Sequence, residues 1–215
     1  MKCLERVINK GRSQGIMLHP ITKQGFFTTS KTELKDIAFA WFGITLAFSF
    51  LIAPELSTGF FAAFGVAGLT VGIGFLLHEL GHKAVAQYYG CSAEFHAFKP
   101  MIYLAIILAI VFKVIFAAPG AVFISGPVGT RRNGIISLAG PVINFGLSLV
   151  FFAMFRANAF PGISFYGYII NSWLGIFNMI PILGLDGKKV LAWSKPAYAA
   201  SLIAGLIIMN LQYLP

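Results

Sequence analysis

The stretch Gly74-Phe75-Leu76-Leu77-His78-Glu79-Leu80-Gly81-His82 contains an HExxH motif within a segment apolar enough to lie in a bilayer. On a helix, His78 and His82 are four residues apart, so both imidazoles leave one face at the spacing that two ligands of a tetrahedral zinc ion need. Glu79 leaves the neighbouring face, where its carboxylate is able to hold a metal-coordinated water and accept its proton. Ionisable side chains are costly in membrane sequence and are retained mainly where they act. The motif therefore predicts a zinc site.

The composition indicates a polytopic membrane protein. The 215 residues are 58% hydrophobic and 11% charged, with a mean hydropathy of +0.82. The net charge of +9 comes from Lys and Arg in loops and termini beside apolar segments, which is a signal of membrane topology and not of a nucleic-acid partner. Cys3 and Cys91 lie far apart, so neither a disulfide framework nor a thiolate metal site is expected. We expect an all-α polytopic membrane protein with about five to six transmembrane helices and a re-entrant or short extended segment.

Two parts of different character follow one another along the chain. Residues 1–36 are predicted to be a basic cytoplasmic N-terminal arm that lies on anionic lipid. They are too short and too polar to form a core of their own, and they do not resemble a cleavable signal peptide. Residues 37–215 are predicted to form one transmembrane domain with its core at 60–190. Ser30 and Glu33 form a capping box that starts the first helix.

Apolar runs predict where the chain crosses the bilayer. The expected spans are 37–53, 60–89, 135–155, 164–185 and 197–214. Residues 90–100 are predicted to be a polar loop. Residues 101–118 are ambiguous, because only 12 apolar residues precede Lys113, and they fit either a short span or a re-entrant hairpin with some extended structure.

Two histidines leave a zinc site short of one protein ligand. Of the seven acidic residues, only Asp186 lies at the end of a spanning segment, and Gly187 after it lets the backbone bend near a ligand. We therefore predict that Asp186 is the third ligand. The main competitor is His96, whose alternative role is that of a solvated loop histidine.

Membrane topology bears on this choice. If residues 101–118 crossed once, Asp186 would finish about 30 Å from His78, a gap that metal bonds of about 2 Å cannot bridge. If they enter and leave on the cytoplasmic side, Asp186 returns to the boundary of the histidines. Most of the 16 basic residues are then cytoplasmic, with Lys113 and Arg156 as exceptions. Charge and ligand geometry favour the re-entrant arrangement, with a cytoplasmic N-terminus and site opening.

Three motifs, each on its own membrane segment, resemble those of the site-2 protease family of zinc intramembrane metalloproteases. They are His78-Glu79-Leu80-Gly81-His82, then Ala139-Gly140-Pro141 with Asn144, then Asn178-Met179-Ile180-Pro181 followed by Asp186-Gly187. The resemblance covers roughly residues 60–190. Gly184 is a departure, since many members have a second proline there. Residues 101–118 are an addition to the minimal family core, and no PDZ-like domain separates the motifs.

The resemblance implies a function and a set of residue roles. One Zn²⁺ per chain is held by His78, His82 and Asp186, with Glu79 as the base and Asn144 near the scissile carbonyl. The expected reaction is hydrolysis of a peptide bond within or beside a transmembrane helix, as in regulated intramembrane proteolysis. The expected partners are a transmembrane protein substrate and the lipid bilayer, with no nucleic acid, in a multi-pass protein of the cell membrane.

Several alternatives stay open at this point. Asn144 is expected either to donate to the tetrahedral oxyanion or to make an interhelical hydrogen bond. Asn178 with Pro181 is interpreted as an irregular helix end that shapes the place for an extended substrate. A transporter or metal sensor would also use the histidine pair, but it would keep moving or detecting metal after Glu79→Gln. A purely structural protein would bind no metal, and a protease with a glutamate as third ligand lacks such a residue in its spans.

Overall fold

The computed structural model describes residues 27–53, 56, 58–115, 119–182 and 184–213, which are mostly helical with a small two-stranded sheet. The predicted arm therefore lies outside the described residues over positions 1–26. The elements, in chain order, are α2 (Lys31–Ile52), α3 (Thr58–Ala67), the π turn η1 (Gly68–Gly72), α4 (Ile73–Tyr88), β1 (Ser92–Ala97), α5 (Lys99–Phe112), β2 (Gly120–Ser125), α6 (Thr130–Arg156), α7 (Pro161–Asn178), α8 (Asp186–Trp193), α9 (Lys195–Asn210) and the 3-10 turn η2 (Leu211–Tyr213).

Four helical stretches in the described chain are long and apolar enough to cross a membrane. They are Lys31–Ile52, Gly59–Tyr88, Thr130–Arg156 and Lys195–Tyr213. They coincide closely with four of the expected spans, so the helical, membrane-type character of the chain is confirmed. The expected span at 164–185 differs, because α7 ends at Asn178 and the backbone then turns over the next residues before α8.

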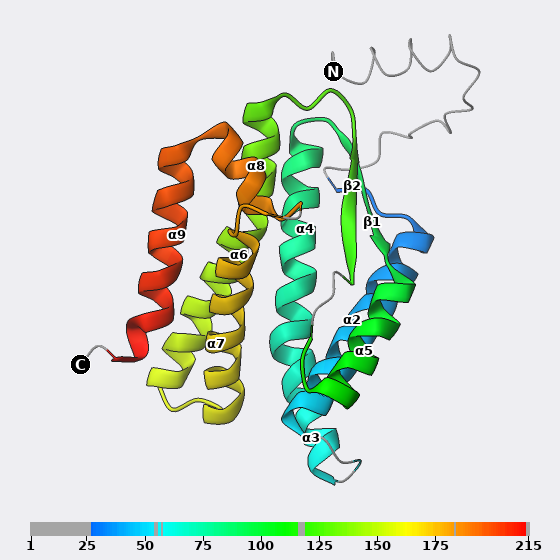
Figure 1. The fold of residues 1–215 in the computed structure, drawn as a ribbon, viewed down its shortest axis with the longest axis vertical. Coiled ribbons are helices and arrows are strands. Elements are labelled where there is room, and N and C mark those ends of the chain that lie inside the picture. The colour runs from blue at the N-terminus through cyan, green and yellow to red at the C-terminus, as the bar shows by residue number, and fades with distance from the viewer. Residues whose placement is uncertain (1–26, 54–55, 57, 116–118, 183, 214–215) are drawn as a thin grey trace.

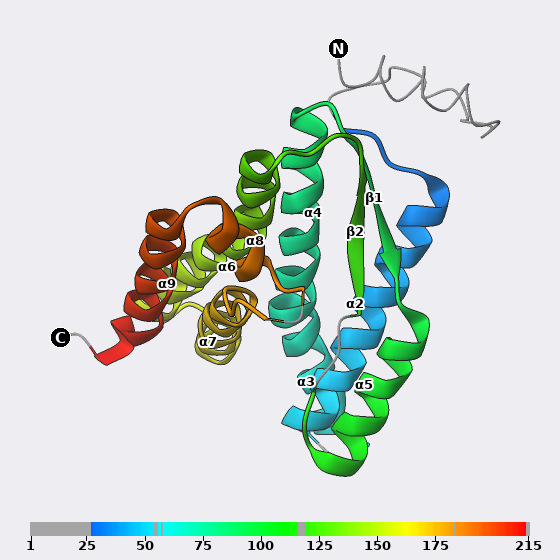
Figure 2. The same ribbon diagram turned by 45° about the horizontal axis from the view of Figure 1, so that its top comes forward.

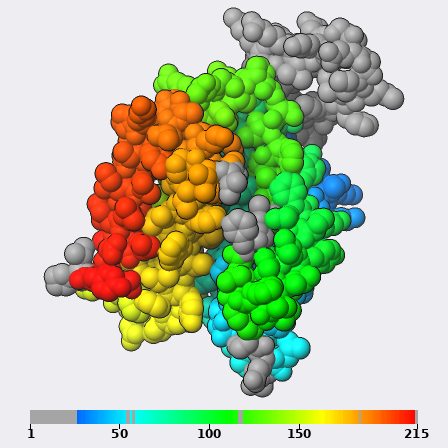
Figure 3. Space-filling model, in the orientation of Figure 1, coloured from blue at the N-terminus to red at the C-terminus, as the bar shows by residue number. Residues whose placement is uncertain are grey.

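The elements are arranged in two groups with α4 between them (Figures 1 and 2). One group contains α2, α5 and the two strands, and the other contains α6 to α9. The start of α2, the end of α4, the start of α6 and the helix α8 all lie toward one end of the molecule. In the space-filling view, α7, α8 and α9 form one side of the visible face and α5 the other (Figure 3).

The long helix expected at 60–89 is confirmed, with a π turn in its middle. Glycines at both ends of this turn let α2 pack directly on its backbone. A Cβ added to Gly68 or Gly72 would come within 2.9 or 2.7 Å of the Trp41 ring. The Trp41 indole N–H donates to the Gly68 carbonyl at 3.2 Å and so satisfies a polar group beside the irregular turn. The helix that contains HELGH is thereby held against α2.

Residues 90–100 do not form the polar loop that we predicted. They contain β1, which pairs with β2 in an antiparallel hairpin with Phe95 opposite Val122. The reason is an alternation that places Ala93 and Phe95 in the core while Ser92 points outward. The extended structure that we expected within residues 101–118 lies instead just after them, in β2.

The segment between β1 and β2 leaves the sheet and returns to it at one place. The Phe98 amide, just before α5, donates to the Pro119 carbonyl, just before β2, at 2.9 Å. α5 packs along α2 and ends at Phe112, because the next residue, Lys113, has a positive φ of 55° that breaks the helix. Residues 116–118 lie outside the described residues. This geometry agrees with the re-entrant hairpin that was one of the two interpretations of residues 101–118, and not with a single crossing.

The start of α2 bears out half of the predicted capping box. The Ser30 hydroxyl accepts from the Glu33 amide at 3.0 Å. The Glu33 carboxylate, however, does not return to the Ser30 backbone. It binds Lys83 of α4 and the backbone amide of Phe95 in β1.

Candidate active site

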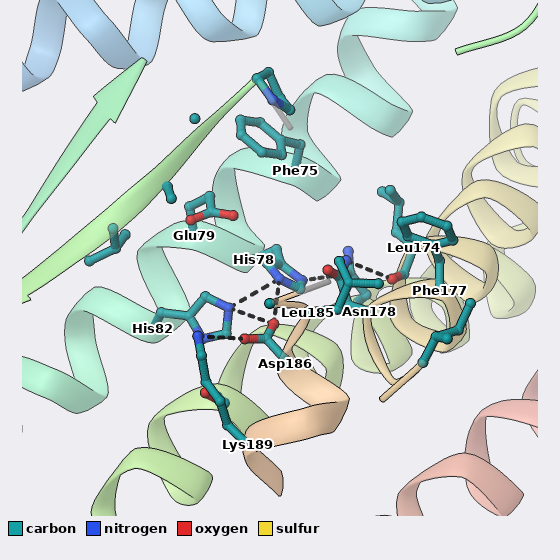
Figure 4. Close-up of a pocket in the computed structure, with 18 of the residues that line it drawn as sticks. Phe75, His78, Glu79, His82, Leu174, Phe177, Asn178, Leu185, Asp186 and Lys189 are labelled. Atoms are coloured by element: carbon teal, nitrogen blue, oxygen red, sulfur yellow. Dashed lines mark hydrogen bonds and ion pairs between the residues drawn. The ribbon is translucent and has the colours of Figure 1, made fainter. Parts of the chain in front are cut away.

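The helix α4 presents the three ionisable residues of HELGH to one pocket (Figure 4). His78 and His82 are buried and point to the same side, toward α8. Gly81 between them allows α6 to approach, because a Cβ there would meet Ile143 at 2.4 Å. The close packing of α4 on α6 therefore depends on this part of the motif.

Hydrogen bonds on the far side of each imidazole fix which nitrogen faces the site. His78 Nδ1 lies 2.5 Å from Asn144 Oδ1, and His82 Nδ1 lies 2.7 Å from the Ile136 carbonyl. Both partners are acceptors, so each Nδ1 carries the proton and each Nε2 presents a lone pair. The two Nε2 atoms are 3.1 Å apart. This is the tautomer in which paired histidines bind a metal.

Asp186 completes the group from the first position of α8. Its Oδ2 lies 3.2 Å from His78 Nε2 and 3.0 Å from His82 Nε2. Gly187 makes this placement possible, since a Cβ there would lie 2.0 Å from the Met179 carbonyl. The structure thus brings together the three residues that we predicted as ligands.

Asp186 has the negative charge that a carboxylate ligand of a metal needs. Burial by itself raises the pKa of this carboxyl, but the hydrogen bonds and charges of His78 and His82 outweigh it and hold the pKa well below its usual range. The other carboxylate oxygen, Oδ1, lies 3.8 Å from the Lys189 ammonium. Asp186 is therefore ionised at neutral pH, with one oxygen toward the histidines and the other toward a cation.

Gly140, on α6, leaves space beside the donor atoms. A Cβ at this position would lie 2.5 Å from His82 Nε2 and 2.6 Å from His78 Nε2. Any larger residue would therefore occupy the space into which the lone pairs point. The AGP motif supplies this space, and Pro141 follows it inside the helix.

The donor set fits zinc. Among the described residues, His78, His82 and Asp186 form a group whose donor atoms all lie within 4.8 Å of one another. Two neutral imidazoles and one carboxylate are a common protein ligand set for a catalytic zinc, which keeps one further position for water or substrate.

Glu79 lies apart from the donor group, on the side of α4 that faces the hairpin (Figure 4). Its carboxylate is within hydrogen-bonding reach of the Val122 backbone amide in β2. Glu79 and the three donor residues border one cavity of about 690 Å³. Residues of β2 and apolar side chains of α2 and α7 also line it. A carboxylate, a candidate metal centre and an exposed strand edge thus share one cavity.

The side chain of Asn144 is not a free donor for an oxyanion. Its Oδ1 binds His78, and its Nδ2 donates to the Gly74 carbonyl at 3.2 Å and to Asn171 Oδ1 at 3.1 Å. Both amide hydrogens therefore have protein acceptors. Of its two expected roles, the structure shows the interhelical hydrogen bonds, and it adds an orienting contact to His78.

The remaining candidates lie away from the donor atoms. His96 is on β1, with Nδ1 3.5 Å from the Asp36 carboxylate and 42% of its side chain exposed. Asn178 lines the cavity and bonds to the Leu174 carbonyl of its own helix. Sequence reasoning missed Lys189 and the β2 edge. A basic residue one turn after Asp186 was a usable signal for Lys189, whereas the position of β2 depends on long-range pairing.

Comparison with known proteins yields relatives that are zinc metalloproteases. Over 190 residues the chain is 39% identical to the zinc metalloprotease candidate MJ0611 of Methanocaldococcus jannaschii, a match that covers 86% of this chain and 94% of that protein. The chain belongs to the site-2 protease family of zinc metalloendopeptidases.

Two other relatives match shorter parts. Zinc metalloprotease MJ0392 of the same archaeon is 28% identical over 123 residues, which is 54% of this chain and 30% of that protein. The zinc metalloprotease candidate Rip2 of Mycobacterium tuberculosis is 28% identical over 145 residues, which is 59% of this chain and 55% of that protein. No family model and no solved structure matches the chain.

One departure from the site-2 protease pattern has a structural reason. Gly184 has a φ of +80°, in the left-handed region, where the fixed ring of proline cannot go. The chain therefore reaches Asp186 by a path that a second proline would not allow. The Asp-Gly pair still starts α8 beside the histidines.

Proposed function

We propose that this site-2 protease homologue is a zinc-dependent intramembrane endopeptidase that cleaves a transmembrane protein substrate within or near its membrane helix. The observation that carries the proposal is the convergence of two imidazole Nε2 atoms and one carboxylate oxygen within 3.2 Å, in a largely apolar cavity that Glu79 also lines. One Zn²⁺ per chain is held by His78, His82 and Asp186.

We also propose that the protein is a multi-pass protein of the cell membrane, with its N-terminus and site opening toward the cytoplasm. The distribution of basic residues supports this orientation. One end of the molecule holds the start of α2, the start of α6 and α8. The basic residues at this end include Lys31, Lys35, Arg131, Arg132, Lys188, Lys189 and Lys195. The opposite end has Arg156, where α6 turns into α7, and Lys113, where α5 ends.

The residues of the site divide the chemistry among themselves. Zinc, when bound, supplies a Lewis acid that acidifies a coordinated water and polarises a carbonyl. Glu79 accepts the proton of the attacking water and delivers one to the leaving amine. Asn144 and the Ile136 carbonyl hold the imidazoles in the required tautomer, and Asp186 supplies the anionic ligand.

An extended substrate segment fits along β2. In the hairpin, Phe95 directs its amide away from β2, so its partner Val122 directs its own amide away from β1, toward Glu79. The outer edge of β2 therefore lines the cavity. A peptide strand that adds to this edge has backbone partners there and passes beside the base. A helical substrate has to unwind locally to bind in this way.

The proposal is tested by reconstituting wild type and Glu79→Gln in vesicles with a single-span model substrate. We expect both proteins to bind one zinc per chain, because Glu79 is not a ligand, and only the wild type to cleave. The matched control is Glu94→Gln, which changes a carboxylate of β1 outside the cavity. Metal transport by Glu79→Gln, or zinc-loaded wild type that cleaves no membrane substrate, would refute the assignment.

A further inference from the structure

A buried ion pair on α4 has no part in the chemistry described above. Both carboxylate oxygens of Glu33 lie 2.6 Å from the Lys83 ammonium, and the side chains are 1% and 0% exposed. Lys83 also donates to Thr29 Oγ1 at 3.1 Å, and its nitrogen lies 4.6 Å from the centre of the Phe27 ring. All the donors of this ammonium are therefore directed at protein groups.

The pair connects the catalytic helix to the hairpin. Lys83 directly follows His82 on α4, while Glu33 Oε1 also accepts from the Phe95 amide of β1 at 2.9 Å. Phe95 lies opposite Val122, the residue whose amide faces Glu79. One carboxylate thus contacts both the helix that bears the site and the pair of strand residues that borders the base. We call Glu33, Lys83 and the Phe95 amide the hairpin junction.

A second carboxylate of α2 repeats the contact. Asp36, one turn after Glu33, accepts from the Ala97 amide at 3.2 Å. Ala97 lies opposite Gly120, at the start of β2. The first turns of α2 therefore cover the outer edge of β1 with acceptors, which leaves the outer edge of β2 as the one that borders the cavity.

Stability alone does not account for this junction. A buried ion pair gains little over apolar side chains of similar volume, because desolvation of the two charges offsets their attraction. What the pair does provide is a fixed distance between α4 and β1, since short charged hydrogen bonds tolerate little displacement. That distance also sets how far the β2 edge lies from Glu79.

We propose that Glu33 and Lys83 are positioning residues that hold the substrate-pairing strand in register with Glu79 and so determine which peptide bond is cleaved. This inference rests on the proposed function. A substrate that adds to β2 takes its register from the strand, and the base acts at one point along it. If the β1–β2 hairpin shifts against α4, a different carbonyl of the substrate lies beside Glu79.

The test is the double variant Glu33→Gln/Lys83→Met, which removes both charges while keeping side-chain volume and an acceptor for the Phe95 amide. The zinc-loaded protein is reconstituted with a single-span substrate, and its products are identified by mass spectrometry. We expect normal zinc content and an increased share of cleavage at neighbouring bonds. The rate at the main bond should fall about tenfold or more, since a misplacement of about 1 Å costs up to about 100-fold.

A matched control separates positioning from general loosening. Ser148→Ala removes a buried hydrogen bond of 2.6 Å to Ser172, between α6 and α7, without touching the hairpin. This variant is expected to cleave the wild-type bond whatever its rate. A double variant with the same product distribution as the wild type would overturn the inference.

A second variant keeps the inference testable if the double variant does not fold. Asp36→Ala removes the acceptor of the Ala97 amide from a partly exposed site, and we expect the products to shift in the same way but less. An unchanged product distribution in Asp36→Ala would then count against the junction. Failure of the wild type to cleave at all would refute the proposed function and is distinguishable from either result.

Discussion

The metal cluster of His78, His82 and Asp186 and the hairpin junction lie on different faces of α4 and use similar groups. Each pairs a carboxylate with nitrogen atoms of α4 at distances of 3.2 Å or less. In the metal cluster, the lone pairs converge on a space that Gly140 keeps open. In the hairpin junction, the ammonium itself fills the centre and every donor has a protein acceptor. The first arrangement is suited to receive an ion, whereas the second is complete without one.

The largest effect is expected when one carboxylate is removed from the metal cluster and, for comparison, one from the α2 residues that contact β1. Asp186→Ala removes one of three donors, so zinc affinity should fall well beyond the roughly 10–100-fold that loss of an outer-shell partner costs. Asp36→Ala, the matched change on the hairpin side, should leave zinc content unchanged. Elemental analysis after exposure to a competing chelator measures both. Equal zinc retention in Asp186→Ala and wild type would remove Asp186 from the ligand set.

The contrast also explains what could be predicted from the sequence. The chemistry of the metal cluster is local, because i and i+4 histidines share a helix face and few acidic residues were available as the third ligand. Asp186 followed from elimination combined with topology. The hairpin junction was missed because Glu33 looked like the second half of a capping box, and because residues 92–97 were interpreted as a loop although Ala93 and Phe95 alternate with polar residues.

The π turn between α3 and α4 could not be predicted from the sequence either. Gly68 and Gly72 are two small residues in an apolar run, and nothing within that run indicates that Trp41 of another helix will donate to the Gly68 carbonyl. Such features depend on the partner that a segment meets, and that partner is chosen by tertiary packing. Motif chemistry was therefore predictable, whereas the contacts that hold the motif in place were not.

A second prediction concerns stability on the hairpin side. Glu33→Ala leaves Lys83 buried without its counter-ion, which should lower the free energy of unfolding by about 3–5 kcal/mol. The double variant Glu33→Gln/Lys83→Met should lose much less, because no unpaired charge remains. Denaturation in detergent compares the two, and zinc per folded chain should be normal in both. A single variant as stable as the double variant would mean that the pair is not buried as described.

The smallest effect is expected at Asn144, the residue that joins the metal cluster to its surroundings. Asn144→Leu removes the acceptor for His78 Nδ1 and frees the ring to rotate, so zinc affinity should fall about 10–100-fold, or roughly 1.4–2.7 kcal/mol. Asn178→Leu is the matched control, because that amide lines the same cavity but donates to the Leu174 carbonyl of its own helix. Chelator competition measures both affinities.

The same variant distinguishes the two roles expected for Asn144. If the residue only orients His78, saturating zinc should restore most of the cleavage rate of Asn144→Leu. If it also donates to the oxyanion, the rate at full zinc occupancy should stay about 100-fold or more below wild type, the usual cost of one such donor. In the present structure both amide hydrogens already have acceptors, at Gly74 and Asn171. An oxyanion role requires the substrate to displace one of them, so restoration by zinc is the outcome that this geometry favours.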